Sequence, residues 1–329
     1  MKKLILLFKV SFACFPFLMI FFLCGCEKES EMTLGIAKSK YGGIPFYRST
    51  TELYQYLASV DTLSSDELIA KEEAAQFCSF GRYADEIYNK IFTEDSTIGV
   101  DSLSIYVQTY YNYLKLTKES DTNYFFDTKL STCPFKYAIN KDRIMQIGDT
   151  IYKFFEQGYI YGSLDCLTQI KSVTERDFEN LSVSDTGRFK VYKQTTSRSH
   201  IQYYEQAANT PTEKVETIVT LYNLSTNDYY KEYRMMAQTV GKHKVGLVWW
   251  KVARDLEESF QVEFYVNSEY HQVSFTFSKN NTKEIVFRVG PYTYLLLEPC
   301  TNDLPYTYFQ SISGYSMTQY VSQTIQYQN

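Results

Sequence analysis

Residues that could perform catalysis form no recognisable motif in this 329-residue chain. No two of its 14 glycines are separated by a single residue, which excludes the fingerprint of dinucleotide-binding proteins and the glycine loop of kinases. Gly241 and Gly246 have the spacing of a phosphate-binding P-loop, but Leu247 stands where that loop needs its lysine. We therefore predict no catalytic residue and favour a protein that is not an enzyme.

Histidines and cysteines can bind metals, but their spacing in this chain argues against it. His200, His243 and His271 lie at neither helical nor strand spacing from one another. Four cysteines follow the N-terminal segment without any Cys-x-x-Cys pair, and they are Cys78, Cys133, Cys166 and Cys300. In an exported protein four cysteines allow three disulfide connectivities, and we favour free, buried thiols. We predict neither a metal nor a cofactor.

Carboxylates keep glycan hydrolysis open as an alternative. Glycoside hydrolases place two carboxyl groups roughly 5–10 Å apart, on either side of the bond that they cleave. Asp255, Glu257 and Glu258 cluster in the sequence, but a solvated loop between two strands explains them better. A hydrolase would have to bring its carboxylates together from distant positions.

The residue with the clearest chemistry is Cys26. Lys2 and Lys3 precede a long apolar segment, and Lys9 leaves a clean apolar run shorter than the roughly 20 residues that span a membrane. The segment ends in residues 23–26 (LCGC), which resemble the bacterial lipobox. We predict that residues 1–25 are a lipoprotein signal peptide and that the Cys26 thiol carries the lipid.

The lipid anchor determines the expected location and partners. Residues 26–47 follow as a tether that begins with acidic residues, as in lipoproteins sent to the outer face of Gram-negative bacteria. We expect a protein of the bacterial outer membrane, anchored by lipid and facing the periplasm or the cell surface. The net charge of −5 argues against a nucleic-acid partner, whose phosphates require a basic surface.

Residues 48–120 show the pattern of a helical module. Residues 49–52 and 64–67 have the spacing of capping boxes and predict the starts of two helices. Gly81 is expected to end the second pattern. A third helix is expected to carry Tyr83, Ile87 and Ile91, and a fourth is expected to open at Asp101 and to include Leu114.

The rest of the chain is rich in β-prone segments. In residues 121–200 we predict a β-meander from the runs 135–138, 143–147 and 150–155, with a short helix at 163–173. In residues 201–329 apolar side chains alternate, which predicts an antiparallel β domain. The fold class is thus α+β: an N-terminal helical module followed by an antiparallel β-rich domain, either a sandwich or a barrel-like sheet.

Three short segments carry a resemblance to known proteins: residues 147–153 (IGDTIYK), 233–237 (YRMMA) and 246–250 (GLVWW). They resemble patches in uncharacterised surface or periplasmic lipoproteins of gut-type Gram-negative anaerobic bacteria, whose domain has no known function. The resemblance implies location and architecture, and it brings no catalytic motif.

Aromatic residues suggest what the protein does. The chain holds 31 tyrosines, a residue type that is enriched at binding surfaces, but only two tryptophans. Trp249 and Trp250 are the candidate binding pair, although neighbours in a strand point to opposite faces and at most one should be exposed. We predict a lipid-anchored cell-envelope protein that binds a glycan or a protein partner without catalysis. The alternatives are a glycan hydrolase and a fimbria-like structural subunit.

Overall fold

The computed structural model describes residues 42–94, 99–121, 123–181, 189–193, 201–223, 230–266, 269–295 and 307–328. They belong to one compact unit that spans Ile36–Asn329. The predicted signal peptide, Cys26 and most of the tether lie outside the described residues. Within the described ranges, no helix has both the length and the apolar character to cross a membrane.

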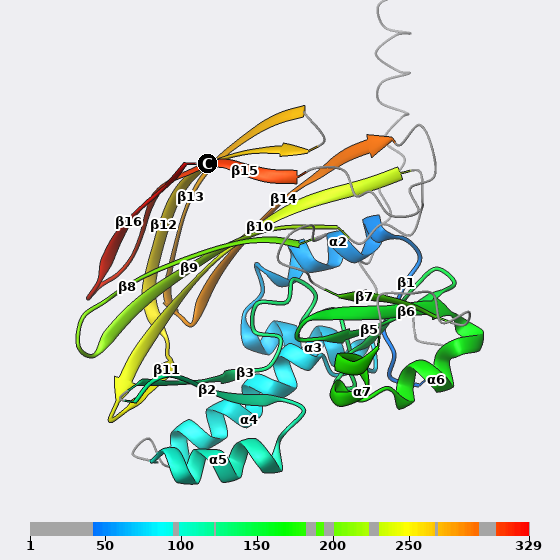
Figure 1. Ribbon diagram of the computed structural model, residues 1–329, viewed down its shortest axis with the longest axis horizontal. Coiled ribbons are helices and arrows are strands. Elements are labelled where there is room, and N and C mark those ends of the chain that lie inside the picture. The colour runs from blue at the N-terminus through cyan, green and yellow to red at the C-terminus, as the bar shows by residue number, and fades with distance from the viewer. Residues whose placement is uncertain are drawn as a thin grey trace, which may run out of the picture. The chain divides into compact units, whose positions relative to one another are not determined.

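Helices form the first part of this unit, as expected (Figure 1). They are α2 (Thr50–Val60), α3 (Ser65–Ala74), α4 (Phe80–Glu94) and α5 (Val100–Thr109). The Ser49 hydroxyl accepts a hydrogen bond from the Glu52 amide at the start of α2, and Ser64 and Glu67 form a complete capping box at the start of α3. Both predicted helix starts are therefore confirmed.

Two details of the helical region differ from the prediction. Gly81 lies in the first turn of α4 and does not break it. Glycine is needed there because a Cβ atom would lie 2.6 Å from the Tyr137 ring. The chain also leaves the helix at Tyr110, so Leu114 begins a strand, β2 (Leu114–Ser120), where a helix was expected. An apolar residue at helical spacing from α5 misled the prediction, because Leu114 is buried in either conformation.

A five-stranded sheet follows, in the order β1-β4-β5-β6-β7. Its strands are β1 (Phe46–Tyr47), β4 (Ile144–Ile147), β5 (Thr150–Phe155), β6 (Gly158–Ser163) and β7 (Lys190–Lys193). The short helix expected near 163–173 is present as η1 (Leu164–Cys166) and α6 (Leu167–Ser172), and α7 (Glu175–Asn180) follows it. The run 135–138 forms turns and no strand, so that prediction was wrong: Phe135 and Ala138 are apolar because they fill the core.

Long antiparallel strands build the remainder. One sheet has the order β2-β3-β11-β10-β9-β8, and β14 also pairs with β10. The other has the order β13-β12-β15-β16. The strands not yet located are β3 (Asn123–Thr128), β8 (Ile201–Asn209), β9 (Glu213–Asn223), β10 (Tyr230–Val245), β11 (Val248–Lys251), β12 (Arg254–Val266), β13 (Glu269–Thr282), β14 (Glu284–Leu295), β15 (Thr307–Thr318) and β16 (Ser322–Gln328).

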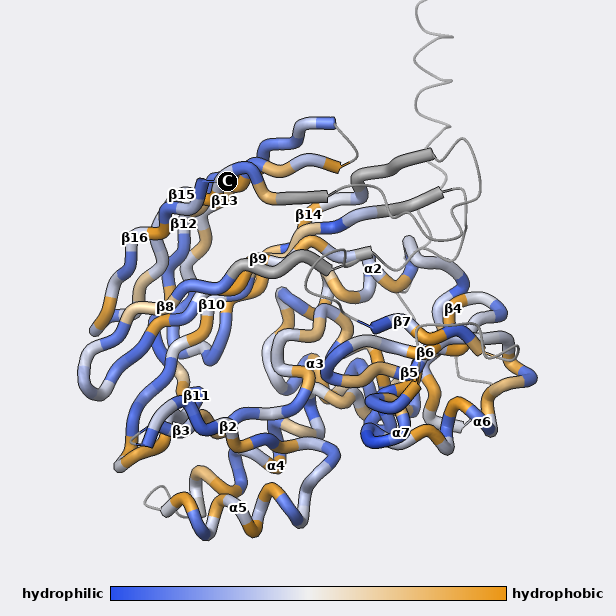
Figure 2. The backbone as a smooth tube through the Cα atoms, viewed as in Figure 1, coloured by the Kyte–Doolittle hydropathy of each residue, from blue (hydrophilic) through white to orange (hydrophobic). Residues whose placement is uncertain are grey.

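The two larger sheets share an apolar core to which both contribute. Val219 and Leu221 of β9 cluster there with Phe260 and Val262 of β12. Figure 2 shows hydrophobic and hydrophilic positions interleaved along these strands, and on β12 every second residue is buried. This alternation is what an antiparallel strand with one covered face requires. The predicted α+β fold with a β-rich part is therefore confirmed.

Candidate functional site

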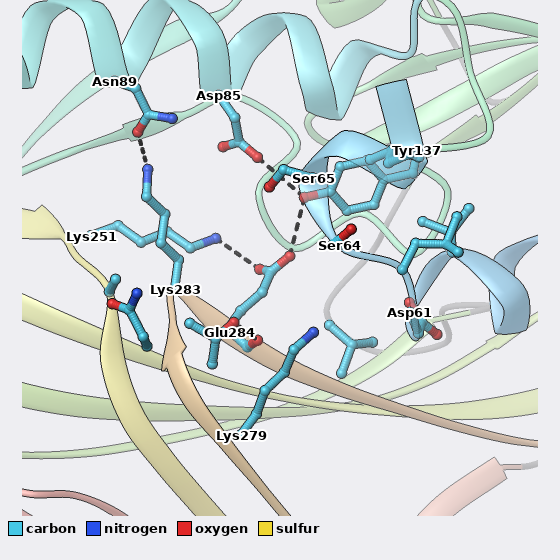
Figure 3. A pocket seen from close by; sticks show the side chains of 17 residues that line it. Asp61, Ser64, Ser65, Asp85, Asn89, Tyr137, Lys251, Lys279, Lys283 and Glu284 are labelled. Carbon is cyan, nitrogen blue, oxygen red and sulfur yellow. Dashed lines mark hydrogen bonds and ion pairs between the residues drawn. The ribbon is translucent and has the colours of Figure 1, made fainter. Parts of the chain in front are cut away.

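A polar pocket of about 500 Å³ lies where α2, α3 and α4 meet the start of β14 (Figure 3). Asp61 caps the end of α2, and Ser64 caps the start of α3. Asp85 and Asn89 are four residues apart on α4, so they lie on one face of that helix. Segments from both ends of the described chain therefore line a single hollow.

Glu284 is the best-connected carboxylate of the pocket. Lys136 Nζ donates to both of its oxygens at 2.9 Å, and Lys251 Nζ donates to Oε2 at 2.7 Å. Burial alone would raise the pKa of Glu284, but the two lysines hold it far below its usual range. Burial would lower the pKa of Lys251, and Glu284 raises it instead. The group is a permanently charged cluster that ties β14 to β11 and to the turn containing Lys136.

Tyr137 places its hydroxyl between two carboxylates, as Figure 3 shows. The hydroxyl lies 3.1 Å from Asp85 Oδ2 and 3.3 Å from Glu284 Oε1, and its single proton is shared between these two acceptors. Burial and the two negative charges raise the pKa of Tyr137 well above its usual value. The phenol therefore stays neutral and acts as a donor inside the pocket.

Lys283 contributes a half-buried amine that is bonded to an amide. Its Nζ donates to Asn89 Oδ1 and lies 5.3 Å from the centre of the Tyr88 ring. Burial lowers the pKa of Lys283, and the neighbouring Lys251 lowers it further, whereas Asp85 raises it. Because the amine bonds a neutral amide, it can exchange that bond for one to a ligand.

Lysines and carboxylates are equal in number among the described lining residues, and two further cations, Lys136 and Arg288, bond to these carboxylates from outside the lining. Three lysines, Lys251, Lys279 and Lys283, stand against three carboxylates among its described lining residues. The carboxylates are Asp61, Asp85 and Glu284. Hydroxyl and amide side chains from Ser64, Ser65, Asn89, Asn281 and Thr282 complete the lining. Such a surface suits a neutral ligand that both donates and accepts hydrogen bonds.

The carboxylates of this pocket do not resemble the acid and base of a glycan hydrolase. Glu284 is held as an anion by two lysines, which prevents it from acting as a proton donor. Asp61 accepts a 2.6 Å bond from Arg288 Nε, although burial still raises its pKa. The hydrolase alternative therefore gains no support from this geometry.

The acidic cluster 255–258 lies on strand β12 and not in the solvated loop that was expected. Its members point to opposite faces of the sheet because neighbours in a strand alternate. Glu257 accepts a hydrogen bond from the Tyr315 hydroxyl, Asp255 accepts one from the Asn281 amide, and Glu258 is fully buried. The cluster is therefore not a carboxylate pair.

The candidate binding tryptophans are both buried. Trp250 is fully enclosed, with ring centres of Phe126 and Tyr88 at 5.0 and 5.8 Å, and Trp249 is 4% exposed beneath the Lys244 amine. Strand β11 is covered on both faces, so alternation exposes neither ring. The pair therefore presents no surface to which a ligand could bind. Cys26, the predicted lipidation site, lies outside the described residues.

The remaining metal-ligand residue types have other partners. His243 Nδ1 lies 2.7 Å from Glu213 Oε1 on paired strands, Cys78 and Cys133 are free thiols, and Cys166 Sγ lies 3.8 Å from Ser163 Oγ. Within the described ranges, no group of three or more His, Cys, Asp or Glu residues could hold a metal ion. Cys300 and His200 lie outside those ranges.

Sequence reasoning did not find the pocket. Asp85 and Glu284 are 199 positions apart in the chain, and no local motif marks either one. The adjacent pair Lys283 and Glu284 was the only local signal, and a charged pair at a turn is ordinarily solvated. Only the strand topology brings these residues to α4.

Comparisons with known proteins give one weak structural neighbour. No protein-family model matches the chain, and no curated protein matches it. The crystal structure of a DUF4848 family protein from Bacteroides thetaiotaomicron is similar at 15% identity, covering 89% of this chain and 100% of that one, with a TM-score of 0.30. The likeness names no activity.

Proposed function

We propose that this protein is a lipid-anchored protein of the bacterial cell envelope that binds a glycan at the pocket of Figure 3 without cleaving it. The observation that carries the proposal is the mixture of hydrogen-bond donors and acceptors in the lining, which includes lysines, carboxylates, hydroxyls and amides. Such a mixture favours sugar hydroxyls, which both donate and accept.

The individual contacts fit such a ligand. Asp85 is an acceptor at the pocket wall, while the Lys283 amine and the Ser65 hydroxyl come from other elements of the lining. Glu284 and Lys251 hold each other, so they fix the shape of the pocket without needing the ligand for neutralisation. A pre-formed polar site of this kind loses little entropy when it binds.

The location in the proposal rests on the N-terminal segment. Residues 1–25 would direct export as a signal peptide and then be removed. The lipid on the Cys26 thiol would attach the chain to the outer membrane, so that the folded unit faces the periplasm or the cell surface. The membrane is then one partner, through the anchor, and a glycan or a protein that carries it is the other.

Binding is tested with the mature protein in detergent, titrated calorimetrically with neutral oligosaccharides selected on a glycan array. Asp85→Ala should weaken binding by tenfold or more because it removes an acceptor from the pocket. Glu86→Ala, the next residue on α4 and exposed, should leave the affinity unchanged. Equal affinity in the two variants would refute the site, and release of shortened oligosaccharides would favour the hydrolase.

The anchor is tested by metabolic labelling with palmitate. Cys26→Ser should abolish the label and release the protein from membranes, because Cys26 is the residue immediately after the predicted cleavage site. Cys24→Ser, two residues earlier in the removed peptide, is the matched control and should stay labelled. A labelled Cys26→Ser variant would contradict the assignment.

A further inference from the structure

A second hollow, of about 370 Å³, lies beside α6 and α7 and shares no lining residue with the first. Its walls include Arg143 just before β4, Lys153 on β5, and residues 173–174, which join α6 to α7. Nothing in the proposed function uses it.

The described lining of this hollow is basic. Four cations line it: Lys141, Arg143, Lys153 and Lys171. Two acids, Asp142 and Glu175, stand against them. Glu175 is bonded to the Arg143 guanidinium, which leaves the amines in excess. The electrostatic environment therefore favours an anion.

Arg143 is held in an unusual conformation at the base of the hollow. Its φ angle is +66°, a left-handed value that residues other than glycine rarely adopt. The guanidinium is buried, donates to Glu175 and to the Asn112 carbonyl, and lies 5.5 Å from the centre of the Phe80 ring. Backbone strain that fixes a buried charge beside a cavity is a recognised mark of a binding site.

Lys153 presents its amine to the same space. Its Nζ donates to the carbonyl oxygens of Lys171 and Val173, each at 2.7 Å. An ammonium group has three donors, so two bonds leave one for a ligand. Burial, and then Arg143, lower the pKa of Lys153 to about 8, against the opposing effects of Asp142, Glu175 and Asp177.

We propose that this hollow binds a small oxyanion, the chemistry shared by carboxylate, sulfate and phosphate groups, with Lys153 as its direct donor. The anion offsets the repulsion between Lys153 and Arg143, and Lys141 and Lys171 at the rim complete its neutralisation. The site stands independently of the glycan pocket, so either one can fail without the other.

The test titrates the mature protein with sodium phosphate, sulfate and acetate at constant ionic strength, with chloride as the reference ion. Binding is followed by calorimetry and by the Cε resonance of Lys153 in ¹³C-labelled protein. At least one oxyanion should bind saturably at pH 7 and shift that resonance. The affinity should fall several-fold from pH 7 to pH 9, as the amine loses its proton.

Two variants decide the outcome. Lys153→Met should weaken binding tenfold or more, while Lys193→Met should not change it. Lys193 is the matched control because its amine also donates to a helical carbonyl, that of Glu179, but lies outside the hollow. If Lys153→Met unfolds, Lys171→Met on the exposed rim replaces it, with a several-fold loss expected. Binding no tighter than chloride, or equal binding in all variants, would overturn the proposal; the preference among the three anions identifies the group bound.

Discussion

Glu258 shows how much a single side chain can link this fold to pH. It is fully buried on β12, where burial raises its pKa to about 7 despite the neighbouring Thr239 hydroxyl. The residue paired with it on β15 is Ser316, whose hydroxyl accepts a 2.8 Å hydrogen bond from the Thr217 hydroxyl. Hydroxyls can accept the proton of a neutral carboxyl but cannot compensate a buried negative charge.

Glu258 should therefore make the protein less stable as the pH rises. Below the unfolded pKa of 4.5 the carboxyl is neutral in both states, whereas above it the folded state alone keeps the proton, up to about pH 7. Between pH 5 and pH 8 this group should cost about 2–3 kcal/mol of unfolding free energy. Urea unfolding at both pH values measures it, and Glu258→Gln should remove most of that pH dependence. Glu257→Gln, on the opposite face, should retain it; the same slope in both variants would contradict the assignment.

The position of Glu258 could have been inferred from the sequence. It has the same parity as Leu256, Phe260 and Val262, which all face inward. The run of charges from Arg254 onwards suggested a loop instead, because solvated charges are the commoner case. In the structure the alternation of buried and partly exposed residues on β12 includes these charged positions, so Glu258 is buried.

At the scale of elements, local signals predicted the helices well and the strands only in part. The capping boxes at Ser49 and Ser64 are local, so they could be recognised without tertiary contacts. Strand β2 could not be recognised in this way. Leu114 continues the helical spacing of α5, and β2 becomes a strand only by pairing with β3, which follows it in the chain. Trp249 and Trp250 illustrate the same limit: alternation assigns them to opposite faces, but only the packing of α4 and β10 covers both.

Close strand approach makes one glycine of β15 irreplaceable. Gly314 has a φ of +148°, and a Cβ atom there would lie 2.0 Å from the Ser259 carbonyl oxygen on β12. Gly314→Ala should destabilise the protein by roughly 3 kcal/mol or more, since both backbone strain and a backbone clash arise. Gly246→Ala is the control: its φ is also positive, at +60°, but nothing lies within 4 Å. It should cost about 1 kcal/mol, and equal shifts in the denaturation midpoint would refute the packing argument.

At the scale of the whole molecule, charged contacts join the helices to the β-rich part. Lys136 and Glu284 connect the central turns to β14, and Lys283 bonds Asn89 on α4. The architecture of these parts followed from the sequence, but the pocket between them did not, because its residues share no motif and meet only through topology. The predicted boundaries at residues 48, 121 and 201 stay predictions.

These connections should make unfolding cooperative. Trp249 and Trp250 are the only tryptophans, so fluorescence reports on β11 and its helical cover, while far-UV circular dichroism reports on the whole chain. The two signals should follow one transition in urea. Separating the helices from the sheet would leave the buried charges of Glu284 and its lysines without their partners, which is costly. Glu284→Gln should shift both midpoints together. A dichroism change at a lower urea concentration than the fluorescence change would show that the parts unfold separately.

The bond between Asp61 and Arg288 has a consequence for how the protein is made. These residues are 227 positions apart, so α2 leaves the ribosome long before the strand that supplies its counter-charge. Contacts between distant positions form slowly, because the entropy of closing the intervening chain is lost before the contact contributes. This contact therefore cannot form until the final third of the chain has been made. Such a delay would suit the export that we propose, in which the chain passes through a narrow channel before it folds.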